Sequence, residues 1–186
     1  PYGNTAPNIY VLHGEMTDEE MNELYNHSKV HAMVSFTKGE GFGRPLLEFG
    51  LTGKPIIASN WSGQVDFLHQ DYTVRLPGQL TDVHESAADD FIMKGTQWFT
   101  VEYSYAAKVL QDVIQNYKAY LSKSRKQIQH VKDNFSRAQM AKRFVDIIDK
   151  CLTEVPQQVD LKLPKLKKAT NEAPKLKLPK LKKVNA

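Results

Sequence analysis

The strongest constraint on how this chain can fold is a strand–helix–strand pattern between residues 32 and 59. The apolar run at 32–36 has the composition of a buried strand, and the run at 55–59 predicts a second, short strand. Between them lies a turn with three glycines, followed by a helix that Pro45 can begin and Gly53 can end. Two strands joined by one helix form the basic unit of a parallel sheet. The pattern therefore predicts an α/β fold.

The glycine-rich turn predicts a binding site for a ligand that contains phosphate. Gly41 and Gly43 allow the backbone to turn tightly and a ligand to approach the main chain. The helix that follows offers unpaired N–H groups and the positive end of its dipole. Glu40 falls at the carboxyl end of the first strand, where open α/β sheets bind ligands, and Glu48 falls about one turn inside the helix. Because carboxylates accept hydrogen bonds from sugar hydroxyls, a nucleotide-sugar matches this layout. The alternative is that Glu40 only caps the helix and Glu48 is solvated.

The run EGFGRPLLEFGLTGKPIIAS, which starts at Glu40, resembles the donor-site signature of the retaining GT-B glycosyltransferases. This superfamily includes glycogen synthases, sucrose synthases and bacterial mannosyl- and glucosyltransferases. The similarity covers about residues 8–152, with further matching segments at 13–37, 59–68 and 134–149. The resemblance implies a Rossmann-like parallel sheet with flanking helices over residues 1–155, which is the donor-binding half of a GT-B fold.

The resemblance also implies a reaction and a set of site residues. The reaction is transfer of a sugar from a nucleotide-diphosphate-sugar donor to an acceptor with retention of configuration, without a bound metal or a cofactor other than the donor. Glu40 would be the catalytic residue, which bonds the sugar hydroxyls beside the reacting carbon, and Glu48 would accept from the ribose hydroxyls. The residues that hold the sugar or the phosphate would be Gly41, Phe42, Gly43 and Arg44. Secondary candidates are Glu15 and Met16, beside the base, and Asp66, where the family has a glutamate. Arg44 is either a charge partner for phosphate or a member of a salt bridge.

A complete GT-B enzyme has two Rossmann-like domains, and a chain of 186 residues has room for one. Since the chain starts at Pro1 and the segment 2–7 carries no Lys or Arg, we expect a fragment that lacks the first βα unit and its phosphate-gripping basic pair. An N-terminal GT-B domain is expected upstream. One alternative is a non-catalytic nucleotide-sugar or glycan binding module tethered through its tail. Another alternative is a different doubly wound protein. The absence of a G-x-G-x-x-G dinucleotide-binding fingerprint from the sequence argues against this alternative.

The rest of the domain shows alternating strand and helix signals. Short apolar runs predict strands at 9–12 and 72–76. Thr17 and Glu20 form a capping-box signature at a helix start, and Ser136 is a good N-cap for the last helix. The apolar stripe of that last helix consists of Met140, Phe144, Ile147, Ile148 and Cys151. The resemblance implies that this helix crosses back onto the N-terminal domain. Because the chain has one cysteine, no intramolecular disulfide forms, and a reducing cytoplasmic compartment fits.

The C-terminal tail differs from the domain in composition. Residues 156–186 hold nine Lys and two acidic residues, a net charge of +7, whereas the preceding 155 residues carry a net charge of −3. The octapeptide LKLPKLKK occurs at 161–168 and again at 176–183, and its prolines and dense like charge predict a disordered tail. We expect an anionic partner, either a membrane surface or nucleic acid, and the lack of aromatic residues in the tail favours the membrane. A solvated tail without a partner is the alternative, so the protein is expected to be either free in the cytoplasm or peripheral at a membrane.

Overall fold

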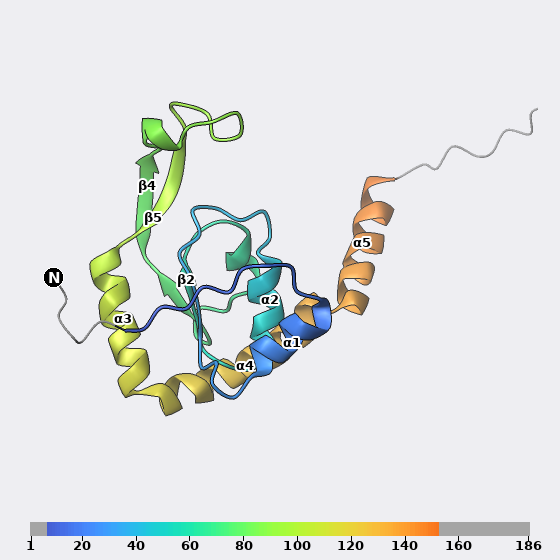
Figure 1. The fold of residues 1–186 in the computed structure, drawn as a ribbon. Helices are drawn as coiled ribbons and strands as arrows, with labels where there is room; N and C mark the ends of the chain where they lie inside the picture. The colour runs from blue at the N-terminus through green and yellow to red at the C-terminus, as the bar shows by residue number, and fades with distance from the viewer. Residues whose placement is uncertain (1–6, 153–186) are drawn as a thin grey trace, which may run out of the picture.

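The computed structural model describes residues 7–152, and the predicted basic tail at 156–186 lies outside this range. A parallel sheet of three strands, in the order β1-β2-β3, forms the centre of the fold. The strands are β1 (Met33–Ser35), β2 (Ile56–Ser59) and β3 (Val74–Leu76). Helices pack against both faces of the sheet, and a two-stranded hairpin extends from it (Figure 1). The prediction of an α/β fold with a Rossmann-like parallel sheet is therefore confirmed.

The central strand β2 is buried along its whole length. It pairs with β1 through the register Met33↔Ile56 and with β3 through Ile57↔Val74. A strand that is covered on both faces has a continuous apolar sequence, because neither set of alternating side chains meets water. The uninterrupted run before Ser59 thus follows from the position of β2 in the middle of the sheet.

Alternate residues of β2 belong to two separate hydrophobic clusters, as the period of two along a strand requires. On one face, Ile57 packs with α3 (Tyr103–Gln115) in a cluster of Ile57, Leu76, Phe99, Val101, Ala106, Val109 and Val113. On the other face, α2 (Arg44–Gly50) contributes to a cluster of Leu46, Phe49, Ile56, Ala58, Phe67 and Leu68. The helix α1 (Asp18–Asn26) covers this second cluster through Tyr25, whose ring meets that of Phe49 edge-on at 5.5 Å.

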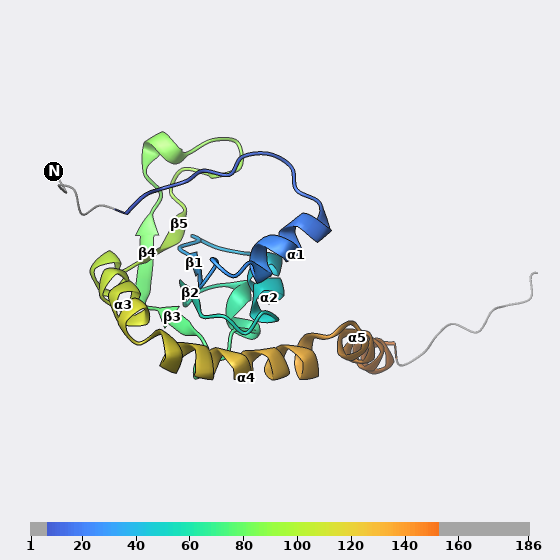
Figure 2. The ribbon, with the colours of Figure 1, turned by 60° about the horizontal axis from the view of Figure 1, so that its bottom comes forward.

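Two further helices end the described part of the chain. The helix α4 (Tyr117–Phe135) passes below the sheet from α3 to α5 (Arg137–Cys151), as Figure 2 shows. Two predicted helix caps are confirmed. Ser136 Oγ accepts a hydrogen bond from the Gln139 N–H at 3.4 Å. The Thr17 hydroxyl and the Glu20 carboxylate each accept from the backbone N–H of the other residue, at 3.2 and 2.8 Å.

The strand predicted at 9–12 is not formed, and this prediction is wrong. The segment is extended but unpaired, and its side chains are exposed, with Ile9 at 86% and Leu12 at 76%. A strand needs a neighbour to satisfy its backbone N–H and C=O groups. Within residues 7–152 the parallel sheet consists of β1, β2 and β3 alone, and this segment pairs with none of them. The strand predicted at 72–76 forms from residue 74, because the N–H groups of Tyr72 and Thr73 bond to His69 O in a turn.

An antiparallel hairpin follows β3, in a region where the sequence carries no clear strand pattern. Its strands are β4 (Gly78–Asp82) and β5 (Gln97–Val101), with a register that opposes Leu80 to Phe99. The hairpin is anchored by β5, since Phe99 and Val101 belong to the cluster on the α3 face. The indole ring of Trp61 stacks on the ring of Phe99, with 5.6 Å between centroids.

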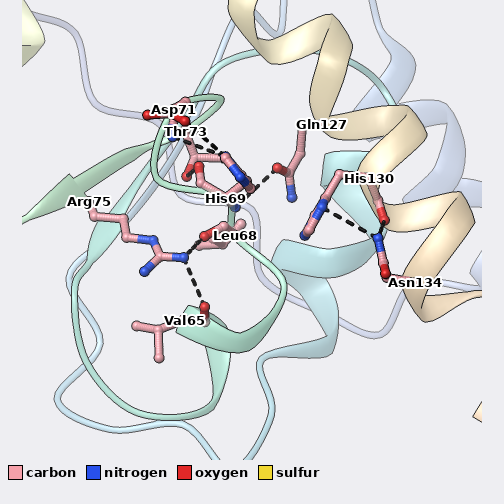
Figure 3. A network of polar contacts seen from close by, with 9 residues as sticks. All are labelled: Val65, Leu68, His69, Asp71, Thr73, Arg75, Gln127, His130 and Asn134. Atoms are coloured by element: carbon pink, nitrogen blue, oxygen red, sulfur yellow. Dashed lines mark hydrogen bonds and ion pairs between the residues drawn. The ribbon is translucent and has the colours of Figure 1, made fainter. Parts of the chain in front are cut away.

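A polar network joins α4 to the chain between β2 and β3 (Figure 3). The buried amide of Gln127 donates to Phe67 O at 2.6 Å and accepts from the His69 N–H at 3.2 Å. The guanidinium of Arg75 donates to the carbonyls of Val65, at 2.9 Å, and Leu68. These bonds pair backbone groups that would otherwise be buried without partners, which is costly. The network therefore fixes the connection between the two strands.

We expect His130 on α4, whose ring lies 5.2 Å from that of His69, to make the domain less stable as the pH falls below about 6.5, the ordinary pKa of histidine. Burial lowers the pKa of His130, His69 lowers it further and Arg75 adds to this, while Asp133 acts in the opposite direction. The unfolded chain therefore takes up the proton at a higher pH than the folded state, so acidification favours unfolding until the folded state also protonates. The free energy of unfolding from urea denaturation should fall between about pH 7.5 and about pH 5.5.

The variant His130→Gln should reduce this pH dependence. His13→Gln is the matched control, because His13 is exposed in the segment before α1. An unchanged pH dependence in His130→Gln would contradict the assignment to His130.

Candidate functional site

The candidate site begins where β1 ends and the chain turns into α2. Gly43 is the N-cap of α2 and has a φ of 87°, a left-handed conformation that favours glycine. The helix starts at Arg44, with Pro45 in its first turn, and ends at Gly50, three residues before the predicted end. It ends early because the backbone N–H and the hydroxyl of Thr52 both donate to Phe49 O, at 2.9 and 2.7 Å. The predicted glycine turn and helix start are thus present, on a helix of seven residues.

The loop that carries Glu40 is clamped by the loop that follows β2. The hydroxyl of Ser62 donates to Glu40 O at 2.5 Å and accepts from the Glu40 N–H at 3.1 Å. The backbone N–H of Gly63 also donates to Glu40 O, at 3.1 Å. A Cβ atom on Gly63 would lie 2.3 Å from Gly41 O and 2.7 Å from Phe42 Cα, so the two loops are in direct backbone contact. We call this arrangement the Ser62–Gly63 clamp.

Ser62 itself is held in an unfavourable conformation. Its φ is 68° and its ψ is −159°, a combination that costs a non-glycine residue about 1–3 kcal/mol. Such residues persist only where the surrounding contacts impose them, and they gather at binding and catalytic sites. The contacts that impose it here are the two hydrogen bonds to Glu40. The strain therefore marks the loop around Glu40 as a candidate functional region.

A buried glutamine ties together the carboxyl ends of β1 and β2. The Nε2 of Gln64 donates to Ser59 Oγ at 2.8 Å and to Ser59 O at 3.2 Å. Ser59 Oγ in turn donates to Thr37 O at 3.1 Å. None of Ser59, Ser62 or Gln64 is among the site residues predicted from the sequence. A Ser-Gly pair just after a strand was the only local signal of a structured turn there.

The hairpin supports the same loop from a second direction. The Phe99 N–H donates to Lys38 O at 3.1 Å, and Lys38 Nζ donates to Thr100 Oγ1 at 2.9 Å. The ammonium group of Lys38 also lies 5.0 Å from the centre of the Trp98 ring, within the range of a cation–π contact. The loop after β1 is thus bound both to the chain after β2 and to β5.

Glu48 lies in a hollow between α1 and α2, apart from Glu40. The hollow has a volume of about 520 Å³, and its lining includes Tyr25, Arg44 and Glu48 but not Glu40. Burial raises the pKa of the Tyr25 hydroxyl, and the nearby carboxylate of Glu48 raises it further, against a smaller opposite effect of Arg44. The two glutamates therefore have different surroundings. Glu40 lies in the loop before α2, and Glu48 lies on α2 in the hollow that faces α1.

Arg44 forms a salt bridge with Glu48. Its Nε lies 2.9 Å from Glu48 Oε1, one helical turn away, and the side chains of Arg44 and Glu48 are 76% and 43% exposed. The sequence left two roles open for Arg44, a charge partner for phosphate or a member of a salt bridge. The structure shows the salt bridge. An exposed pair of this kind contributes little to stability, about 0.3–0.5 kcal/mol, so a ligand could separate the two side chains at low cost.

The secondary candidates are all exposed. Glu15 and Met16 are exposed in the segment before α1. Asp66 is exposed at the end of a short 3-10 helix, Gly63–Asp66, where its charge raises the pKa of Arg75 against the larger effect of burial. Among residues 7–152, no three His, Cys, Asp or Glu side chains gather closely enough to hold a metal ion. In the same range, no helix has the length and apolar character needed to cross a membrane.

Residues 5–94 match the family model described as glycosyl transferases group 1. The matched part contains the whole parallel sheet, α2 and the clamped loop. Over these residues the chain is similar to that glycosyltransferase family. A search among curated proteins found no match.

Proposed function

We propose that this domain binds a nucleotide-diphosphate-sugar and transfers its sugar to an acceptor with retention of configuration. The observation that carries the proposal is the loop around Glu40, which the Ser62–Gly63 clamp holds in one conformation beside the carboxyl ends of β1 and β2. Open α/β sheets bind ligands at this edge. A loop held in advance lowers the entropy lost when the ligand binds. The match of this segment to a glycosyltransferase family adds independent support.

In this proposal the two glutamates have different roles. Glu40 accepts hydrogen bonds from the sugar hydroxyls beside the reacting carbon and stabilises positive charge that develops in an oxocarbenium-like transition state. The backbone from Gly41 to Arg44 holds the sugar or the phosphates. Glu48 leaves its salt bridge with Arg44 and accepts from the ribose hydroxyls. Glu15 and Met16 border the base, and Asp66 has a secondary role. We further propose that the acceptor binds to an N-terminal GT-B domain.

Thermal-shift titration with UDP, GDP and ADP, and with their glucose and mannose conjugates, tests donor binding. A ligand that binds the folded state raises the unfolding midpoint as its concentration increases. We expect a shift with one nucleotide and a dissociation constant about 10- to 100-fold higher in Glu48→Gln, because a hydrogen bond to a charged group contributes about 1.5–3 kcal/mol. Glu23→Gln is the matched control, since Glu23 is exposed on α1 outside the hollow. Equal affinity in wild type and Glu48→Gln would refute the ribose-binding role.

A non-catalytic binding module with the same fold is the second candidate. The pairing of Arg44 with Glu48 favours it, because a paired Arg44 does not stabilise the negative charge that develops on a departing diphosphate during transfer. A module of this kind would bind the nucleotide-sugar in the titration but release no sugar from it. Incubating the protein with the donor that binds, and measuring free nucleotide over time, separates the two candidates.

A further inference from the structure

Two glutamines are buried within residues 7–152, and their amide groups are paired to different extents. Gln64 is 0% exposed and Gln127 is 1% exposed. The amide of Gln127 is paired at both ends, because Nε2 donates to Phe67 O and Oε1 accepts from the His69 N–H (Figure 3). The Oε1 atom of Gln64 is buried and has no hydrogen-bond partner within residues 7–152. The two residues therefore differ in how completely the fold uses a buried amide.

The orientation of the Gln64 amide follows from its contacts with Ser59. The carbonyl oxygen of Ser59 can only accept a hydrogen bond, and Nε2 donates to it at 3.2 Å. The hydroxyl of Ser59 donates its own proton to Thr37 O at 3.1 Å, so its oxygen accepts from Nε2, at 2.8 Å. A rotation of the amide by 180° would place Oε1 against both of these oxygens. The unpaired atom is thus the carbonyl oxygen of Gln64.

An unpaired buried oxygen opposes stability. Removal of a carbonyl group from water without a donor costs free energy, and an apolar side chain of similar shape avoids this cost. Most buried polar side-chain atoms in folded proteins are paired, so an exception calls for an explanation. Because the pairing of Ser59 and the unpaired oxygen act on stability in opposite directions, stability alone is a weak reason for a glutamine at this position.

Gln64 contacts both ends of the loop that carries Glu40. At the start of this loop, Nε2 lies 3.4 Å from Thr37 Oγ1, and the Ser59 hydroxyl to which it donates is bonded to Thr37 O. At the end of the loop, a Cβ atom on Gly43 would lie 3.4 Å from Gln64 Cβ, which is van der Waals contact. The side chain of Gln64 therefore contacts the segment 37–43 on both sides of Glu40.

We propose that Gln64 is a positioning residue for the catalytic glutamate Glu40. Its amide is buried and touches no substrate, and it acts by holding the two ends of the loop while the Ser62–Gly63 clamp holds the backbone of Glu40. A shift of about 1 Å in a catalytic group can lower the rate about 100-fold. This inference rests on the proposed function of Glu40.

The variant Gln64→Met tests this role, because methionine has a similar length but no amide. In the full chain, the rate of nucleotide release from saturating donor should fall about 100-fold. Affinity for the nucleoside diphosphate, which Glu48 governs, should be unchanged. Gln127→Met is the matched control, since it also removes a buried amide that pairs backbone groups and should also lose stability. Below the unfolding midpoints of all three proteins, the control should keep the wild-type rate.

Hydrogen exchange provides a second readout that requires no activity. Without ligand, the backbone amides of residues 37–43 should exchange faster in Gln64→Met than in the wild type, because the loop opens more often. Gln127→Met should leave the exchange of this segment unchanged.

Three results would overturn the proposal. The first is unchanged exchange at 37–43 in Gln64→Met, and the second is a wild-type rate of nucleotide release in this variant. The third is an equal loss of rate in Gln64→Met and Gln127→Met, which would reflect stability alone. A wild type that releases no nucleotide from any of the donors refutes the proposed function and the effect of Gln64 on the rate with it. In that case the exchange at 37–43 still decides whether Gln64 orders the loop.

Discussion

Replacement of Gly63 by Ala is expected to destabilise the domain by about 1–3 kcal/mol, the usual effect of overpacking a filled site. The added Cβ would lie 2.3 Å from Gly41 O and 2.7 Å from Phe42 Cα. Both are backbone atoms, so no side-chain rotation relieves the overlap, and the two loops must separate. The separation breaks the hydrogen bond from the Gly63 N–H to Glu40 O. Urea denaturation measures the loss of stability, and thermal-shift titration should show the loss of nucleotide-sugar binding.

Gly41→Ala is the control for this experiment, because it adds the same methyl group to the facing loop. A Cβ at Gly41 meets no atom within 4 Å, and its φ is outside the left-handed range. Stability should therefore stay within about 0.5 kcal/mol of the wild type. If a donor approaches the backbone of this loop, Gly41→Ala should still weaken donor binding. A Gly63→Ala protein that unfolds like the wild type would contradict the clamp.

Glu40→Gln is expected to lower sugar transfer or donor hydrolysis by about 100- to 1000-fold, the usual effect of removing one group that stabilises transition-state charge. The amide keeps the shape of the side chain but lacks its negative charge. The loop should keep its conformation, because Ser62 and Gly63 bond to the backbone of Glu40 and not to its carboxylate. The rate of nucleotide release from the bound donor is the measurement.

Binding of the nucleoside diphosphate without its sugar should be unchanged in Glu40→Gln. The variant then differs from Glu48→Gln, which is expected to lose affinity for the nucleotide itself. Glu23→Gln again serves as the control on an exposed glutamate. A Glu40→Gln protein with the activity of the wild type would rule out a catalytic role for this residue.

Features that depend on neighbours in the sequence could be predicted. The capping box of Thr17 and Glu20 joins residues three positions apart, and both hydrogen bonds are present. Ser136 caps α5 in the same local way. The run at 55–59 predicted a short strand, and β2 forms there from Ile56 to Ser59.

The wrong prediction at 9–12 has a non-local cause. The apolar run there has a suitable composition for a strand, but a strand also requires a paired neighbour, and composition carries no information about one. The hairpin of β4 and β5 is the opposite case. Its strand residues are polar or mixed, yet pairing and the anchoring of Phe99 and Val101 in the core hold it.

The sequence by itself determined the α/β class, the glycine turn before α2 and the amphipathic pattern of α5, because period and backbone sterics act over a few residues. Only the tertiary structure decided that Ser62, twenty-two positions from Glu40, holds the candidate loop in place. It also decided that Glu40 and Glu48 occupy separate surroundings and that nothing in residues 7–152 covers the stripe of α5. These properties depend on contacts between residues that are far apart in the sequence. Such contacts are set by the packing and hydrogen bonding of the whole domain, and no short segment determines them.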